Sequence, residues 1–264
     1  MHVITVANQK GGVGKTTTTL ALCAGFAQKG FKVLGIDLDP QGNFTKTAAI
    51  QNDEDVYTAY SVLKLNCLLS EAIQTSDHGF DAVPSGKTLS FVEGEISSQL
   101  NKYYRLKEQL TSIEGKYDYV FIDVPPSLGL YTLNALTASN EVLIPSLADS
   151  YALEGIIELY KTVGDVKKYN DNPDLAILGI VLTMYDPRPS ITKVSEMMAE
   201  TISEKIKAPV FETKIRVNVA VKSAQVYQES IFSFKKTSNA AIDYENLVKE
   251  IIKREKALAK GAKN

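Results

Sequence analysis

The chain has 264 residues, of which 44% are hydrophobic and 23% charged, a balance typical of a soluble globular protein with one large core. The formal net charge of −2 excludes a chain that is basic throughout, as a general nucleic-acid binder would be. No apolar run approaches the roughly 20 residues of a membrane helix, and the N-terminus lacks a signal-peptide pattern. Two cysteines, Cys23 and Cys67, are too few for a disulfide framework, so we expect a cytoplasmic protein.

Predicted strands alternate with predicted helices along the chain. Nearly continuous Val, Ile and Leu runs, typical of strands buried on both faces of a parallel sheet, occupy residues 2–8, 32–39, 81–85, 119–124, 141–146 and 177–185. Helix-length segments lie at 16–29, 103–113, 152–169, 193–207 and 239–258. The alternation predicts a single α/β domain, residues 1–258, with a mostly parallel sheet and helices on both faces. Residues 259–264 are expected to be a frayed basic tail.

The first predicted strand runs into the segment "NQKGGVGKTTTT", which begins at Asn8. A glycine-rich loop between a strand and a helix directs backbone N–H groups at phosphate oxygens, and the helix N-terminus adds positive charge. This pattern places Lys15 at the β- and γ-phosphates, the Thr16 hydroxyl on Mg²⁺, and Thr17 near the α-phosphate. The predicted phosphate-binding residues are Lys10, Gly11, Gly12, Val13, Gly14, Lys15, Thr16 and Thr17.

The loop departs from the standard P-loop of NTPases at its start. The standard pattern requires glycine at position 9, where this chain has Gln9, and Lys10 precedes the glycine pair instead. The variant K-G-G-V-G-K-T-T resembles the deviant Walker A motif of the ParA/MinD ATPases. That resemblance implies an ATP-sandwich homodimer in which Lys10 contacts the phosphates bound by the other subunit. A second cation would stabilise the triphosphate charge, more strongly where the dimer excludes water.

Two further segments supply carboxylates at the ends of predicted strands. "GIDLDPQGN" places Asp37 and Asp39 at the C-terminal edge of the sheet, where open α/β sheets bind ligands. It resembles the ParA motif D-x-D-P-Q-G-N, and this implies that Asp39 positions or activates the attacking water and Asp37 supports the Mg²⁺ shell. "YDYVFIDVPPSLG" ends an apolar strand at Asp123, which matches a Walker B aspartate that holds Mg²⁺, usually through water.

The implied reaction is Mg²⁺-dependent transfer of the terminal phosphoryl group of ATP to water. Lys10, Lys15 and Asp39 are the predicted catalytic residues, and Thr16, Asp37 and Asp123 are the predicted magnesium residues. No arginine adjoins these motifs in the sequence, so slow intrinsic turnover that a partner accelerates is expected.

The C-terminal half resembles the family less closely. "VLTMYDPR" resembles the strand and loop near the base, which implies that Thr183 and Met184 lie near adenine, although ordinary strand-end packing explains them equally well. "IRVNVAVKSAQ" stands where the family has I-P-R-N-V-R-L-S-E-A-P. Asn218 matches and is predicted on the nucleotide side, whereas Arg216 occupies the proline position.

The resemblance also implies that the ATP dimer binds nonspecific DNA through salt-dependent phosphate contacts. Residues 246–264 contain six basic and two acidic residues, which is either a basic contact surface or a solvated helix end. The other candidate cations, each of which could equally be a solvated surface residue, are Lys193, Lys214, Arg216, Lys222, Lys235 and Lys236.

Together these motifs are similar to those of a ParA-type partition ATPase. Such a protein would segregate or position plasmid or chromosome DNA with a ParB-like partner, would be nucleoid-associated, and would have no stable membrane association. One alternative is a MinD-like membrane-associated positioning ATPase, and another is a ParA-like positioner of a non-DNA cargo. The first depends on whether the apolar residues of the last helix, Leu247, Val248, Ile251, Ile252 and Leu258, contact a membrane or pack on the domain. An iron–sulfur reductase would need cysteines at a dimer face.

Overall fold

The computed structural model describes residues 1–51, 55–147 and 152–261, and the side chains it describes exclude those of residues 152–153, 189–195 and 258–261. A seven-stranded sheet with the order β3-β4-β2-β5-β1-β6-β7 forms its centre. The strands are β1 His2–Val6, β2 Val33–Asp37, β3 Gln74–Thr75, β4 Asp81–Val83, β5 Tyr119–Asp123, β6 Glu141–Leu147 and β7 Ala176–Thr183. Every pairing is parallel except that of β3 with β4, so the predicted mostly parallel sheet is confirmed. Sequence reasoning missed β3 because two residues carry no periodicity.

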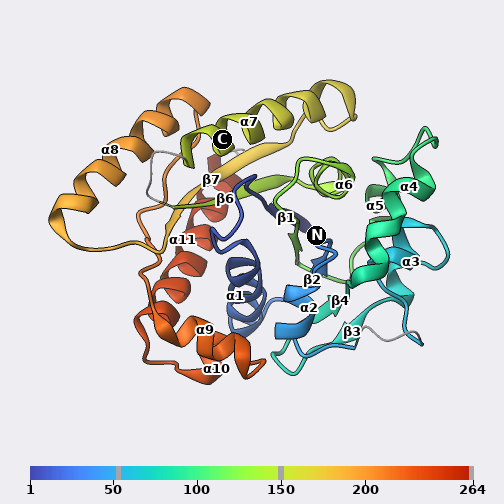
Figure 1. Cartoon of the computed structure of the whole chain (residues 1–264), viewed down its shortest axis with the longest axis horizontal. Helices are drawn as coiled ribbons and strands as arrows, with labels where there is room; N and C mark the ends of the chain where they lie inside the picture. The colour runs from blue at the N-terminus through green and yellow to red at the C-terminus, as the bar shows by residue number, and fades with distance from the viewer. Residues whose placement is uncertain (52–54, 148–151, 262–264) are drawn as a thin grey trace.

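Helices cover both faces of the sheet (Figure 1). The first are α1 Lys15–Gln28, α2 Asn43–Thr47, α3 Ala59–Leu63, α4 Val92–Ile96, α5 Arg105–Leu110 and α6 Leu130–Ala138. They are followed by α7 Ala152–Tyr169, α8 Pro189–Ile206, α9 Val219–Val226, α10 Ile231–Phe234 and α11 Asn239–Gly261, and three 3-10 turns lie at Leu69–Glu71, Lys87–Phe91 and Thr111–Ile113. The five predicted helices are present, α7 with the predicted bounds and the other four with shifted ends. The others, which have four to nine residues, were missed because they are too short to show a helical period.

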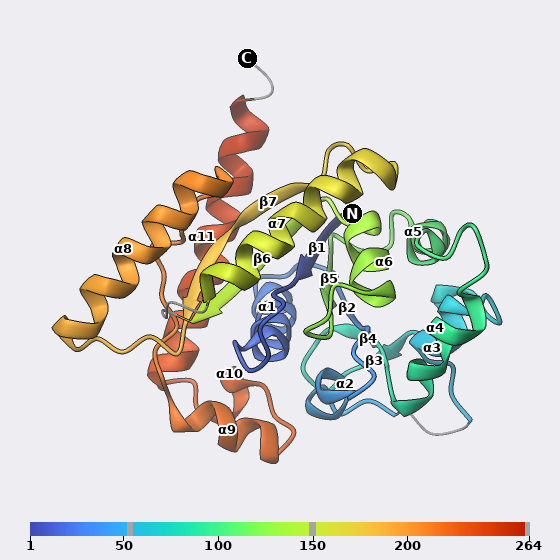
Figure 2. The ribbon, with the colours of Figure 1, turned by 45° about the horizontal axis from the view of Figure 1, so that its top comes forward.

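The alternation of side chains along each strand divides the core into two layers. On β1, Val3 packs with residues of α3 to α8, whereas Ile4 and Val6 pack with residues of α1, α2 and α9 to α11. Figure 2 shows α6 and α7 on one side of the sheet and α1 on the other. This is the predicted arrangement of helices on both faces.

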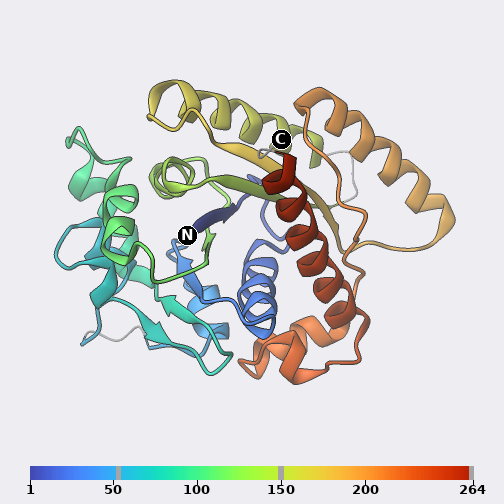
Figure 3. The same ribbon diagram turned by 180° about the vertical axis from the view of Figure 1, so that it is seen from behind.

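The last helix packs along the first. Figure 3 shows α11 beside α1 in front of the sheet. Leu247, Val248 and Ile251 are fully buried and Ile252 is partly buried, so this apolar group packs on the domain, as one of the two interpretations predicted. The side chain of Leu258 lies outside those described. The helix continues to Gly261, three residues beyond the predicted end of the domain, and residues 262–264 of the expected tail lie outside the described residues, so the tail stays a prediction.

The sheet order brings the three motif segments together. β5 lies between β1 and β2, with Asp123 in register with both Val6 and Asp37. The phosphate loop that follows β1 therefore begins beside the ends of the two strands that carry the carboxylates. Segments more than 100 residues apart in the chain meet at one edge of the sheet.

Replacing glycine by alanine is expected to change the free energy of unfolding in opposite directions at two helical positions. A methyl group at Gly25 of α1 would lie 2.7 Å from Cγ2 of buried Val248, whereas one at exposed Gly164 of α7 would meet nothing within 4 Å. Gly164→Ala is expected to raise the free energy of unfolding by ~0.5–1 kcal/mol, because alanine restricts the unfolded chain and favours a helix. Gly25→Ala is expected to lower it by ~1–3 kcal/mol through overpacking between α1 and α11. Urea unfolding measures both, and equal effects would contradict the packing described.

Candidate functional site

The phosphate loop, residues 8–14, depends on glycine for its backbone conformation. Gly12 has φ 74° and Gly14 has φ 85°, both in the left-handed region that side chains disfavour. Gly14 directly precedes α1, and no side chain caps that helix end. A methyl group at Gly11 or Gly12 would meet nothing within 4 Å, so open space lies next to the loop. The loop thus offers unshielded N–H groups and a helix N-terminus to an anion.

Asn8 anchors the start of the loop, a role that sequence reasoning missed. Its side-chain nitrogen donates to the Pro145 carbonyl at 2.8 Å, and its oxygen accepts from the Lys10 N–H at 2.9 Å. A methyl group at Gly155 of α7 would lie 3.1 Å from the same oxygen, so the helix packs closely here. A buried polar residue directly after an apolar strand was the available signal.

Thr183 anchors the other side of the loop from the end of β7. Its hydroxyl lies 2.8 Å from the Val13 carbonyl and 3.2 Å from the Ser146 carbonyl, and the residue is 2% exposed. The next residue, Met184, is half exposed with φ 48°. Thr183 therefore holds the loop through its hydroxyl, and the adenine contact of these two residues stays a prediction.

Lys15 is the first residue of α1, and its side chain folds back over the phosphate loop. It is 8% exposed, and its ammonium donates to the Lys10 carbonyl at 3.1 Å. Burial lowers the pKa of Lys15, and the nearby carboxylates of Asp123 and Asp39 oppose that change. A partly desolvated ammonium in this position is a strong partner for a phosphate group. Lys10 itself is half-buried at the start of the loop.

Thr16 and Asp123 form the pair predicted for magnesium. The Thr16 hydroxyl donates to Asp123 Oδ2 at 2.8 Å, and the Thr19 hydroxyl, which sequence reasoning missed, donates to Asp123 Oδ1 at 3.3 Å. Asp123 is fully buried, and burial together with the neighbouring Asp37 raises the pKa of its carboxyl group well above the usual range. A hydroxyl beside buried carboxylates is an oxygen donor set that fits Mg²⁺, whose charge would offset the cost of their ionisation.

Both carboxylate oxygens of Asp37 accept hydrogen bonds from the segment that follows β2. Its Oδ1 accepts from the Asp39 N–H at 3.0 Å, and its Oδ2 accepts from the N–H and the hydroxyl of Thr45 at 2.9 and 2.7 Å. Burial raises its pKa to about 6, although these hydrogen bonds act in the opposite direction. Asp37 therefore fixes the backbone of residues 38–45. Support of a magnesium ion by this residue remains a prediction.

Asp39 is held at the mouth of the site. Its Oδ1 accepts from the Gln41 N–H at 2.9 Å, and its backbone carbonyl accepts from the Ser85 hydroxyl at 2.8 Å. Gly42 follows with φ 61°, and a methyl group there would lie 3.1 Å from the Ser85 carbonyl oxygen. The segment after β4 thus fixes the backbone of the predicted catalytic residue Asp39, a contact for which the sequence carried no signal.

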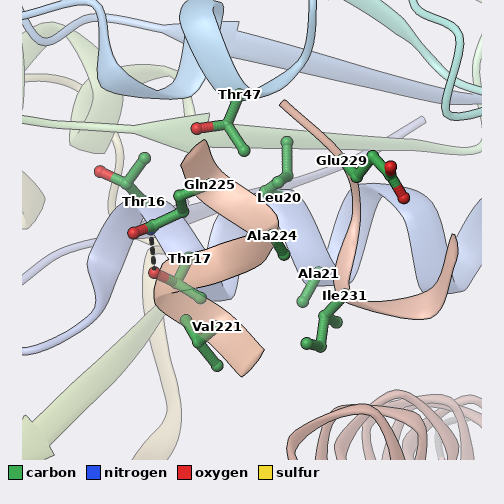
Figure 4. A pocket seen from close by; sticks show the side chains of 10 residues that line it. All are labelled: Thr16, Thr17, Leu20, Ala21, Thr47, Val221, Ala224, Gln225, Glu229 and Ile231. Atoms are coloured by element: carbon green, nitrogen blue, oxygen red, sulfur yellow. Dashed lines mark hydrogen bonds between the residues drawn. The ribbon is translucent and has the colours of Figure 1, made fainter. Parts of the chain in front are cut away.

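Helix α9 closes the site on the α1 side. Figure 4 shows side chains of α1 and α9 facing each other, with the Gln225 amide beside the Thr17 hydroxyl, to which it donates at 2.9 Å. The hollow between the two helices has a volume of ≈ 10 Å³. Asn218 caps α9, its side-chain oxygen accepting from the Ala220 N–H at 2.9 Å. That oxygen is engaged within the protein, so a nucleotide contact by Asn218 remains a prediction.

The predicted DNA-contacting cations differ in their surroundings. Arg216 forms a two-bond ion pair with Asp243 of α11, at 2.9 and 2.6 Å, so it holds the segment before α9 against that helix. Lys214 pairs with Glu196 and lies 4.9 Å from the centre of the Tyr185 ring. Three cations on or next to α9 and α10 are exposed: Lys222, Lys235 and Lys236. Lys193 belongs to α8, and its side chain lies outside those described.

Comparison with known proteins agrees with this geometry. A family model described as an AAA domain matches residues 1–177. The chromosome partitioning protein ParA of Caulobacter vibrioides is 38% identical over 259 residues, which cover 97% of this chain and 96% of that protein. The sporulation initiation inhibitor protein Soj of Bacillus subtilis is 38% identical over 250 residues, which cover 94% and 97%.

Solved structures agree with the fold. The cobyrinic acid a,c-diamide synthase of Mycobacterium smegmatis, solved with an ATP analogue and magnesium, is 32% identical with a TM-score of 0.85 over 97% of this chain and 96% of that one. The cell division ATPase MinD of Pyrococcus furiosus has a TM-score of 0.74 over 96% and 98% of the two chains, and at 23% identity it bears on the fold alone. This chain therefore belongs to the AAA domain family and, within it, to the ParA-type P-loop ATPases of the ParA/MinD superfamily.

Proposed function

We propose that this protein is a partition ATPase that hydrolyses ATP with Mg²⁺ and forms a homodimer around ATP. In that state it binds nonspecific DNA and segregates plasmid or chromosomal DNA with a ParB-like partner. The observation that carries the proposal is the convergence of Lys15, Thr16, Asp39 and Asp123 at a phosphate loop that begins with a second lysine, Lys10. The similarity to relatives named as chromosome partitioning proteins supports DNA as the cargo.

Each residue would act on the phosphates through position and charge. Lys15 and the loop N–H groups bind the phosphates, and Thr16 and Asp123 hold Mg²⁺, which when bound neutralises phosphate charge. Asp39 orients the attacking water from its fixed place in the loop after β2. Lys10 of one subunit reaches the phosphates of the other, so that ATP becomes part of the interface. Asn8 and Thr183 keep the loop in place while charge develops.

DNA binding would follow from dimerisation. Lys222, Lys235 and Lys236 are exposed on neighbouring segments around α9 and α10. One such patch is small, but two patches in a dimer form a single, larger phosphate-binding surface. ATP would therefore control DNA binding through geometry, and the protein would be nucleoid-associated in the cytoplasm.

The other candidate functions have less support from the described residues. A MinD-like membrane anchor would need the apolar face of α11, but that face is buried against the domain, and none of the described helices could span a membrane. An iron–sulfur or thiol-dependent reaction would need accessible cysteines, whereas Cys23 and Cys67 are buried and burial raises the pKa of both thiols. A protein that positions a non-DNA cargo would use the same ATPase residues. Measurement of DNA binding by the ATP dimer therefore distinguishes a DNA cargo from a non-DNA cargo.

Lys15→Ala is expected to weaken ATP binding by ~30-fold or more, because the variant removes a partly desolvated charge partner of the phosphates. Isothermal titration with ATP and Mg²⁺ measures the change. Lys32→Ala, at an exposed position before β2, serves as the control and should leave the affinity unchanged. Tight ATP binding by Lys15→Ala would refute the assignment of the phosphate loop.

Lys10→Ala is expected to retain ATP binding within several-fold and to lose the ATP-dependent dimer, because its charge acts across the interface. Sedimentation with ATP, ADP and no nucleotide measures dimerisation, and fluorescence anisotropy with duplex DNA at two salt concentrations measures binding. Wild type should bind DNA only with ATP, and more weakly at high salt. An ATP-dependent dimer of Lys10→Ala would refute the role in trans. Failure of a wild-type dimer to bind DNA would favour a non-DNA cargo.

Asp39→Ala is expected to keep the ATP dimer and to lower turnover by ~10²–10⁴-fold, the range typical of a lost general base or water-positioning group. Phosphate release under single-turnover conditions measures this step directly. Asp174→Ala, on the exposed segment before β7, is the matched control. Normal turnover in Asp39→Ala would show that another group positions the water.

A further inference from the structure

A second cluster of metal-binding side chains lies at the end of the sheet opposite the phosphate loop. His2 begins β1, Glu141 begins β6, and Glu255 lies in the C-terminal part of α11. Their ligand atoms all lie within 4.8 Å of one another. His2 Nε2 is 2.9 Å from Glu141 Oε2 and 3.6 Å from Glu255 Oε1. Three elements from both ends of the chain and from its middle thus direct one nitrogen and two carboxylates to one point.

One of these oxygens lacks a hydrogen-bond donor. Glu255 Oε1 is buried without a hydrogen-bond partner, while Glu255 Oε2 accepts from the Tyr119 hydroxyl. Tyr119 therefore orients the carboxylate so that its other oxygen lies beside His2 and Glu141. Burial raises the pKa of Glu255, the hydrogen bond from Tyr119 and the charge of His2 oppose that change, and the charge of Glu141 adds to it. A buried acceptor without a donor costs free energy, and a bound cation would remove that cost.

The donor set fits zinc better than magnesium. Zinc bonds of about 2.0–2.2 Å in a tetrahedron separate neighbouring ligand atoms by about 3.3–3.6 Å. The 3.6 Å from His2 Nε2 to Glu255 Oε1 is at the upper end of that range, and the 2.9 Å to Glu141 Oε2 is below it. Imidazole favours Zn²⁺, whereas Mg²⁺ prefers oxygen ligands. The two carboxylates carry the charge that a divalent cation neutralises. The His2 side chain is 34% exposed, so water can reach the remaining coordination position.

We propose that His2, Glu141 and Glu255 form a zinc site that fastens α11 to the beginnings of β1 and β6. Tyr119 is a positioning residue of this site, because it holds the carboxylate of Glu255. The site is independent of ATP turnover. Its zinc would join the first strand, which leads to the phosphate loop, to the last helix, which covers α1.

The test uses the full chain, freed of any affinity tag, stripped with a chelator and titrated with Zn²⁺ by calorimetry. Excess Mg²⁺ is present throughout, so that the nucleotide site does not report zinc. One Zn²⁺ per chain and a higher melting temperature with zinc are expected. Glu141→Gln and Glu255→Gln should each weaken binding at least ~10-fold, and Tyr119→Phe should weaken it by ~10-fold through misorientation of Glu255. Glu245→Gln, an exposed glutamate on the same helix, should change nothing.

The variants also separate this site from simpler chelation. Absence of zinc binding by the wild-type chain would overturn the proposal. So would binding that is lost in His2→Asn but unchanged in both glutamine variants, because it would place the metal at the chain terminus alone. With Co²⁺ as a probe, the visible absorption of a tetrahedral site should appear in wild type and in Glu245→Gln and be lost in Glu255→Gln. This readout does not depend on stability.

Discussion

The site depends on the pairing of β5 between β1 and β2. That pairing places Asp123 in register with Val6 on one side and with Asp37 on the other. Because parallel strands end at a common edge, the loop after β1 and the carboxylates of β2 and β5 are adjacent without any further adjustment. The helix dipole of α1, the loop N–H groups, the Thr16 hydroxyl and the carboxylates of Asp37 and Asp123 therefore lie at one edge of the sheet.

Two fully buried carboxyl groups and one buried lysine lie at this edge of the sheet, so the negative groups outnumber the positive one. Asp37 and Asp123 are fully buried next to each other, and burial raises the pKa of both carboxyl groups. Lys15 is the nearby cation, and its own pKa is lowered by burial. A nucleotide with its metal ion, bound as proposed, would bring the opposite charges to this region and would lower the electrostatic cost of these buried groups. Shifted pKa values among buried titratable groups are typical of functional sites.

Several side chains connect the site to the outer elements. Thr183 ties the loop to β7, Ser85 ties Asp39 to the segment after β4, and Gln225 ties Thr17 to α9. Arg216 in turn holds the segment before α9 against α11 through Asp243. Thr17, which lies in the first turn of α1 just after the phosphate loop, is thus bonded directly to α9, the helix that carries the exposed Lys222. The cluster of His2, Glu141 and Glu255 lies at the opposite end of the same strands, away from these contacts.

The sequence by itself determined the elements whose signals are local. The phosphate loop, the two carboxylate motifs, the alternation of strands and helices, and helix α7 at residues 152–169 were all predicted, because each is encoded in consecutive residues. Only the tertiary structure decided which side chains already have partners. Asp37 is bonded to Thr45, Arg216 to Asp243, and Thr183 to Val13, and the last two pairs join distant parts of the chain. His2 and Glu255 meet across nearly the whole sequence. Such contacts depend on the order of strands in the sheet and on the path of α11, which local patterns of hydrophobicity and turn residues do not encode.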